Sequence, residues 1–118
     1  MSQLPNAATA TSTDAKITQY LLDPNHPANS GKAKFFGLFG FSLANWSVLK
    51  AALLDHPRRN SVSSQWTTAY GEKYEVSCSL ATPDGRNPCV VSYWVIEPTD
   101  PNPKFVTAYA HPTFVMPP

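Results

Sequence analysis

Charged residues are scarce in this sequence. Asp, Glu, Lys and Arg together make up 14% of the 118 residues, whereas about a quarter is usual in soluble proteins. The formal net charge is +1, so the chain lacks the strongly basic overall field typical of nucleic-acid-binding proteins. Basic residues gather between positions 24 and 73, where six of them against two acidic residues leave a local excess of +4. This excess marks either an anion-binding surface or a chance scatter of solvated charges.

Long apolar runs are absent too. No segment approaches the ~18–20 consecutive apolar residues that a membrane span needs, so no membrane association is expected. The N-terminal stretch "MSQLPNAATATSTDAK" lacks the charged start and apolar stretch of a secretory signal, which favours a cytoplasmic location. Its small polar residues predict a flexible segment over 1–13. We expect one domain over 14–112 and a C-terminal tail over 113–118.

Only two cysteines are present, Cys78 and Cys89. Their spacing fits neither a metal site nor a thioredoxin-like redox motif. The sequence also contains no Gly-rich phosphate loop, no Ser-His-Asp spacing pattern and no internal repeat. We therefore expect neither a metal ion nor a cofactor.

The first half of the chain carries helical patterns. In "DAKITQYLL" (14–22), Ile17, Tyr20 and Leu21 share one apolar stripe, and Thr13 or Asp14 can cap the start. The stretch "GKAKFFGLF" predicts a second helix over 31–39, capped by Ser30.

A third helix is predicted over 43–56, in "LANWSVLKAALLDH". Ser42 is its expected cap, and Pro57 is expected to follow its end. Trp46, Leu49 and Leu53 share a face at helical spacing, so this face should pack against the rest of the core.

After residue 60 the apolar spacing changes to strict alternation. It predicts strands over 74–81 and 89–97, joined by a hairpin turn at an Asp-Gly pair. Further strands are predicted over 104–110 and, as a short edge strand, over 64–68. Helices followed by strands indicate an α+β fold, with N-terminal helices packed on a three- to four-stranded antiparallel meander.

The register of the hairpin can be predicted. If the turn is centred on its Asp-Gly pair, the numbers of paired residues sum to 169, so Cys78 meets Val91 and every other inward partner is apolar. Cys78 and Cys89 then lie diagonally on one face, about 7–8 Å apart, which is too far for a disulfide. Both are expected to be reduced and buried. Trp94 would lie on the opposite face, which is either solvent-exposed or the lining of a cleft.

The stretch "DPNHPANSGKAKFF" (23–36) contains the first candidate functional residues. It places His26 in a proline-bracketed loop, just ahead of Lys32 and Lys34 at a helix start. Cations at a helix N-terminus oppose the macrodipole, so an anionic partner would explain them. The alternative is that both lysines are simply solvated.

Five further residues could bind a nucleic acid. Thr107 and Tyr109 lie two apart on one strand and therefore share a face, where their hydroxyls could bind phosphate oxygens; alternatively, Tyr109 is a half-buried core residue. Arg58 and Arg59 could contact a backbone phosphate, or are solvated. Trp94 offers a stacking surface for a base, or is a core side chain.

The chain from Leu4 to Tyr109 resembles a bacterial domain of unknown function. That domain is met at the C-termini of polymorphic toxins and of phage head-morphogenesis-type proteins. The matching stretches are "LPNA" (4–7), "KITQYLLDPNHPANSGKAKFFGLFGF" (16–41), "NWSVLKAALLDH" (45–56), "YGEKYEV" (70–76), "PDGRN" (83–87), "WVIEP" (94–98) and "FVTAY" (105–109). Such domains look like members of the barnase/EndoU/colicin/RelE-like ribonuclease fold.

The resemblance implies a metal-independent endoribonuclease toxin that cleaves RNA through its own 2′-OH. It carries over His26, Lys32, Thr107 and Tyr109 as catalytic candidates; Lys34, Arg58, Arg59 and Trp94 are the substrate-binding candidates that the residues themselves suggest. His26 would be the base or the acid, and Lys32 would stabilise the transition-state charge. A strand ending in Thr-Ala-Tyr-Pro recurs in such toxins, whereas here Thr-Ala-Tyr is followed by Ala110.

The expected partners are RNA, with tRNA as one possible class, and a cognate antitoxin or immunity protein. The place of action would be the cytoplasm of the producing cell or of a target cell. The competing hypothesis is a non-catalytic interaction module that binds a protein partner, either a degenerate toxin domain or a component of a phage or mobile-element assembly. The two differ in one geometric respect: an enzyme requires His26 and Lys32 to face the same cleft as Thr107 and Tyr109.

Overall fold

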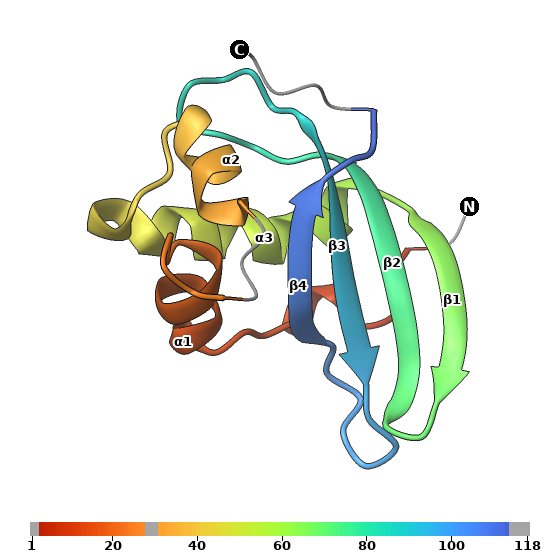
Figure 1. The fold of residues 1–118 in the computed structure, drawn as a ribbon. Helices are drawn as coiled ribbons and strands as arrows, with labels where there is room; N and C mark the ends of the chain where they lie inside the picture. The colour runs from red at the N-terminus through yellow and green to blue at the C-terminus, as the bar shows by residue number, and fades with distance from the viewer. Residues whose placement is uncertain (1–2, 28–30, 114–118) are drawn as a thin grey trace.

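The fold is a layer of helices on one face of a four-stranded antiparallel sheet (Figure 1). The computed structural model describes residues 3–27 and 31–113. Along the chain the helical elements are η1 (Ala7–Thr9), α1 (Asp14–Lys16), η2 (Ile17–Leu21), α2 (Lys32–Leu38), η3 (Leu43–Asn45) and α3 (Trp46–Arg59). The strands are β1 (Val62–Thr68), β2 (Gly71–Ser79), β3 (Cys89–Ile96) and β4 (Lys104–Ala110), in the spatial order β1-β2-β3-β4. The predicted α+β meander is confirmed.

The first two helices form where the apolar spacing predicts them. The Thr13 hydroxyl accepts a hydrogen bond from the Lys16 backbone N–H, and α1 continues without a break into the π-helical turn η2. The helix α2 begins at Lys32, after Gly31 in the left-handed region (φ 82°). The predicted cap of this helix, Ser30, lies outside the described residues.

The third helix ends later than predicted. Ser42 and Asn45 form a capping box at the start of η3, which leads directly into α3. Because α3 runs to Arg59 and contains Pro57, the expected end before this proline is wrong. A proline in the last turn removes only one backbone donor, and its fixed φ is compatible with the helix. The Asn60 side-chain amide also donates to the carbonyl oxygen of His56 at 3.0 Å.

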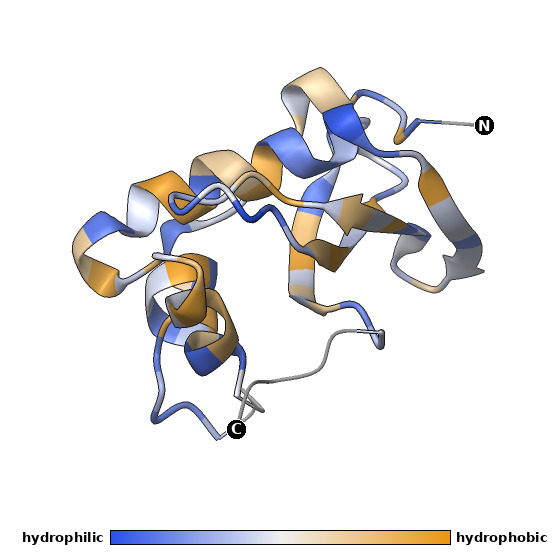
Figure 2. Ribbon diagram, turned by 90° about the horizontal axis from the view of Figure 1, so that it is seen from above, coloured by the Kyte–Doolittle hydropathy of each residue, from blue (hydrophilic) through white to orange (hydrophobic). Residues whose placement is uncertain are grey.

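Apolar and polar residues alternate along the α3 ribbon (Figure 2), as a helix that packs with one face requires. Leu49 and Leu53 are fully buried, and Trp46 is half-buried against the same core. The sheet contributes Val76, Val90 and other residues of β2, β3 and β4 to this core.

Residues 3–13, which the composition predicts to be flexible, are packed against the domain. Leu4 and Ala10 are buried in the core. Thr11 forms an isolated bridge with Lys104 at the start of β4, and the Arg58 guanidinium donates to the carbonyl oxygen of Ala8 at 3.0 Å. These contacts place the segment against the same core as the helices.

The hairpin register differs from the predicted one by a single residue. Cys78 pairs with Val90 rather than Val91, and Tyr74 pairs with Trp94. A one-residue shift moves every side chain of the second strand to the other face. Trp94, expected on the opposite face, is therefore in the core with 0% of its surface exposed.

Cys78 was expected in the core but is exposed, whereas Cys89 is half-buried; both thiols are free. The backbone of Cys78 has φ 127°, a conformation that non-glycine residues rarely adopt. This local turn of the strand places the Cys78 side chain outside the core, although its neighbour Val76 on the same strand is fully buried.

A buried polar network joins α3 to the two central strands. His56 has 0% exposure, and its Nε2 lies 2.8 Å from the carbonyl oxygen of Cys78. Because a carbonyl can only accept, Nε2 carries the proton, and Nδ1 accepts from the Ser92 hydroxyl at 2.8 Å. The Ser92 oxygen in turn accepts from the Trp94 indole N–H at 2.8 Å. The neutral imidazole thus forms one hydrogen bond with β2, at the Cys78 carbonyl, and one with β3, at the Ser92 hydroxyl.

Replacing Leu53 by alanine is expected to lower the free energy of unfolding by about 2–5 kcal/mol, because it leaves a cavity in a fully packed core. Chemical denaturation measures this loss. Leu43→Ala is the matched control, since Leu43 is 50% exposed, and it should change the stability by less than about 0.5 kcal/mol. Equal effects of the two substitutions would contradict the described core.

The stability should fall as the pH is lowered below 6.5. Burial has the largest effect on the pKa of His56, and it outweighs the hydrogen bonds with the Cys78 and Val90 backbone, which raise the pKa, so the pKa lies below its ordinary value of 6.5. As the pH falls, the unfolded chain therefore takes up this proton before the folded chain does. The free energy of unfolding then decreases by up to about 1.4 kcal/mol per pH unit until the folded-state pKa is reached.

Urea unfolding at a series of pH values measures this slope. His56→Gln can still offer an amide donor and a carbonyl acceptor but has no proton to take up in this range, so its slope should be shallower than that of the wild type. Identical slopes would show that His56 is not held neutral.

Candidate functional site

A pocket of about 580 Å³ opens between the first helix and the edge strand β4. Its walls come from segments that are far apart in the sequence. The lining residues are Thr13, Ala15, Lys16, Gln19, Tyr20, His26, Val106 and Thr107. Two residues singled out from the sequence, His26 and Thr107, thus lie in one pocket.

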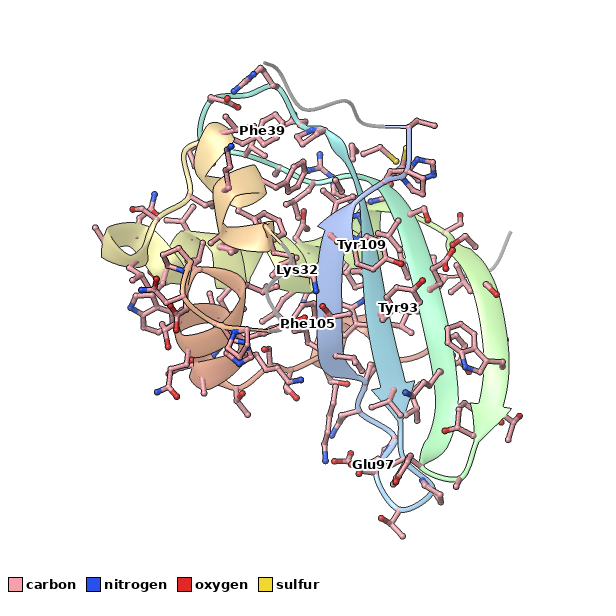
Figure 3. All side chains as sticks on the ribbon, viewed as in Figure 1. Lys32, Phe39, Tyr93, Glu97, Phe105 and Tyr109 are labelled. Carbon is pink, nitrogen blue, oxygen red and sulfur yellow. The ribbon has the colours of Figure 1, made fainter. Side chains whose placement is uncertain are left out.

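The hydroxyl group of Tyr20 is the centre of this site. The Lys32 ammonium donates a hydrogen bond to it at 2.6 Å, and the Thr107 hydroxyl lies 3.1 Å from it. Tyr20 therefore joins α2 to β4, and Figure 3 shows Lys32 of α2 directed toward that strand. Lys32 and His26 thus lie close to Thr107, whereas Tyr109, which the enzyme hypothesis also places in this group, contacts Tyr93 instead.

Two cations surround the Tyr20 ring. The Nζ atom of Lys32 lies 4.9 Å from the ring centroid and that of Lys16 lies 5.9 Å from it, both within cation–π range. The Lys16 ammonium also donates to the carbonyl oxygen of Val106 at 3.1 Å. The pocket wall is therefore positively charged at the point where Thr107 presents its hydroxyl.

These contacts alter the acidity of the Tyr20 phenol. Burial by itself raises the pKa, but the hydrogen bonds from Lys32 and Thr107 and the charges of Lys32 and Lys16 outweigh it, so the pKa lies below the ordinary 10.0. Hydrogen bonds and cations favour the phenolate over the phenol. This tyrosine is therefore a stronger acid than a solvated one.

His26 packs against Tyr20 from the loop that precedes α2. The two ring centroids are 5.2 Å apart at an interplanar angle of 78°, and the His26 backbone N–H donates to the carbonyl oxygen of Asp23 at 3.3 Å. The imidazole is half-buried and lines the pocket, where it can exchange protons with a bound molecule.

Tyr109 lies outside this group. Its hydroxyl is 2.8 Å from the hydroxyl of Tyr93, and Tyr93 donates to a carboxylate oxygen of Glu75 at 2.8 Å. The ring of Tyr93 also meets that of Trp66, with centroids 5.9 Å apart. These side chains occupy the sheet face opposite the helices, and Figure 3 labels Tyr93 and Tyr109 on neighbouring strands.

Trp94 cannot stack on a base because it is fully buried; that substrate-binding prediction is wrong, and the one-residue register shift explains the error. Arg58 is bonded to the N-terminal segment, and Arg59 approaches Asp55 at 3.8 Å. Neither arginine lines the pocket, and neither does the exposed Lys34. Of the four predicted substrate-binding residues, the structure brings none to the pocket.

Two residues at this site, Tyr20 and Lys16, are not among the functional residues predicted from the sequence. Tyr20 belongs to an apolar helix stripe with Ile17 and Leu21, so the pattern indicates a core residue. The available signal was that a tyrosine at the edge of such a stripe needs a partner for its hydroxyl. Lys16 carried no signal, because only the folded chain brings it to the ring.

Among residues 3–27 and 31–113, no group of three or more His, Cys, Asp or Glu side chains is placed to hold a metal ion. In the same described part of the chain, no single helix is long and apolar enough to cross a membrane. One pair of helices, Lys32–Leu38 and Leu43–Arg59, reaches that length and apolar content when taken together, but the pair is bent by 72°.

Comparison with known families assigns the chain to one of them. Residues 3–112 match the family described as "Domain of unknown function (DUF6883)". The chain belongs to this family. Every residue of the pocket falls within the matched range.

One solved structure with a similar fold is a "Contact-dependent growth inhibition toxin - immunity protein complex from Klebsiella pneumoniae 342". A chain of that complex superposes with a TM-score of 0.65 at 14% sequence identity, over 82% of this chain and 95% of that one. At this identity the likeness shows a shared fold, one that occurs in a toxin–immunity assembly. A comparison with curated proteins finds no match.

One tyrosine should titrate below its ordinary pKa of 10.0, because Lys32 lies beside the Tyr20 hydroxyl. Ultraviolet difference titration, which records tyrosinate absorbance against pH, measures it. Lys32→Met removes the donor and the charge and should raise the pKa of this tyrosine, whereas Lys34→Met should leave it unchanged. A titration curve unaffected by Lys32→Met would contradict the contact.

Proposed function

We propose that this domain is a metal-independent endoribonuclease toxin that cleaves RNA by 2′-OH transphosphorylation. The observation that carries the proposal is the group formed around Tyr20: the Lys32 ammonium and the Thr107 hydroxyl contact its hydroxyl, and the His26 imidazole packs on its ring in the adjoining pocket. Cations and hydroxyl donors suit a phosphate, and an acid–base pair suits proton transfer around it. The shared fold with a chain of a toxin–immunity complex supports the same class.

In the proposed reaction the ribose 2′-oxygen attacks the adjacent phosphorus, a bond from the 2′-oxygen to phosphorus forms, and the bond to the 5′-oxygen breaks. His26 takes the proton of the 2′-OH, and Tyr20, whose pKa is lowered, gives its proton to the departing 5′-oxygen. Lys32 and Lys16 stabilise the extra negative charge that the phosphoryl oxygens carry in the transition state. Thr107 orients a phosphate oxygen.

The substrate would continue from the pocket across the open face of the sheet. Thr107 pairs with Tyr93 on the neighbouring strand. The Tyr93 ring contacts that of Trp66, which is 38% exposed. In place of the buried Trp94, these two rings and that of Tyr109 are the candidate stacking surfaces for unpaired bases. Lys73 pairs with Trp66 in the register and adds a positive charge on that face.

An immunity protein or antitoxin is the proposed protein partner, since the related solved chain comes from a toxin–immunity complex. It would protect the cytoplasm, where RNA is cut, by covering the pocket. The second candidate function, a non-catalytic module that only binds such a partner, is the hypothesis that the following experiment excludes or supports.

Purified protein is expected to cleave total RNA or tRNA in the presence of EDTA and to leave 2′,3′-cyclic phosphate ends. Lys32→Ala should reduce the cleavage rate by about 100-fold or more, because it removes a charged donor from the transition state. Gel assays of end-labelled RNA measure both the rate and the chemistry of the ends.

Lys34→Ala is the matched control, because Lys34 lies on the same helix but is exposed and away from the pocket; its rate should stay close to that of the wild type. Circular dichroism checks that both variants are folded. Folded wild-type protein that cuts no RNA under these conditions would favour the binding-module hypothesis.

A further inference from the structure

The two cysteines are closer than the hairpin pattern of the sequence predicts. Ser79 is paired with Cys89 in the β2–β3 ladder, so Cys78 lies one residue from the position opposite Cys89. Paired strands place opposite Cα atoms about 4.5–5.5 Å apart, and each residue advances about 3.3 Å. The Cα atoms of the two cysteines are thus separated by about 6 Å, inside the range of ~4.4–6.8 Å that disulfides use.

The conformation of Cys78 supplies the correct orientation. In a regular strand Cys78 and Cys89 would point to opposite faces of the sheet. The φ of 127° at Cys78 turns its side chain out of the core, where it is exposed beside the half-buried Cys89. Burial first, and then the hydrogen bond and charge of the Cys78 thiol, raise the pKa of Cys89 to about 12, as expected for adjacent thiols.

This turned backbone is held in place from the helix layer. The imidazole of His56 donates to the carbonyl oxygen of Cys78 at 2.8 Å, and the amide of Asn60 donates to the carbonyl oxygen of Ser79 at 2.9 Å. A rare backbone conformation persists only where the surrounding structure fixes it. The juxtaposition of the thiols is therefore part of the packed fold rather than a frayed strand end.

We propose that Cys78 and Cys89 form a reversible intramolecular disulfide site whose oxidant is a low-molecular-weight disulfide such as oxidised glutathione. The thiolate of Cys78, the exposed member, attacks one sulfur of the oxidant, which releases one thiol and leaves a mixed disulfide on Cys78. Cys89 then loses its proton and attacks the Cys78 sulfur, and the second thiol leaves. Two protein thiols are oxidised and one disulfide is reduced to two thiols.

The bond would link β2 to β3 directly beside the hairpin loop. It would restrict the unfolded chain by closing a loop of about ten residues, so the oxidised form is expected to melt at a temperature several degrees higher than the reduced form. Neither cysteine lines the pocket at Tyr20, and formation of the disulfide does not require ribonuclease activity.

The test is to incubate the purified full chain with oxidised glutathione at a pH near the ordinary thiol pKa of ~8.5, and to follow intact mass and free thiols. The wild type should lose both thiols, gain no glutathione and remain a monomer by size-exclusion chromatography. Cys89→Ser should instead accumulate one glutathione on Cys78. Cys78→Ser should react at least about tenfold more slowly, because its remaining thiol is less exposed and has a raised pKa.

Three outcomes would overturn the proposal: a stable glutathione adduct on the wild-type chain, two wild-type thiols that both stay free, or a disulfide formed only between two chains. The wild-type mass alone decides between these outcomes, so the result does not depend on either variant folding. A dithiol reductant should restore both thiols and the lower melting temperature.

Discussion

The hydrogen bonds of the buried His56 are satisfied when the Ser92 and Trp94 face of β3 meets the helices. Its two ring nitrogens bind the Cys78 carbonyl and the Ser92 hydroxyl, and Ser92 also satisfies the indole N–H of Trp94. A buried polar group without a partner would cost about 1–3 kcal/mol. In the alternative register Ser92 and Trp94 would face outward and His56 would lose its side-chain partner. The observed register is the one that leaves these groups satisfied.

The candidate site follows from that register. With Trp94 inside, Tyr93 faces outward beside Tyr109 and opposite Thr107. Because β4 is an edge strand, the first helix can reach past it, and the Tyr20 hydroxyl meets Thr107 there. Lys32 joins from α2 through the same hydroxyl. The pocket thus forms where the helix layer, the sheet edge and the outer face meet.

Sequence patterns were sufficient for the architecture, because helix and strand periodicities differ and the buried faces of Leu49, Leu53 and Val76 are strongly marked. The patterns were insufficient for the register, since apolar residues run through both faces of β3 and either alignment pairs apolar side chains. The polar network that selects one alignment involves His56, which lies far from the hairpin in sequence. Likewise, Lys32, His26 and Thr107 could be identified from the sequence as candidate functional residues. Tyr20, whose hydroxyl joins Lys32 to Thr107, could not, because it lies in an apolar helix stripe.

The proposed function requires that the pocket around the Tyr20 hydroxyl bind an RNA phosphate. The most direct test is to titrate the isotope-labelled protein with a short oligonucleotide that lacks the attacking 2′-hydroxyl, and to map the backbone amide shifts by NMR. Saturable shifts are expected, centred on Tyr20, Lys32 and Thr107, with the amides of Arg58 and Arg59 unmoved. Shifts confined to other surfaces, or none at all at this pocket, would contradict it.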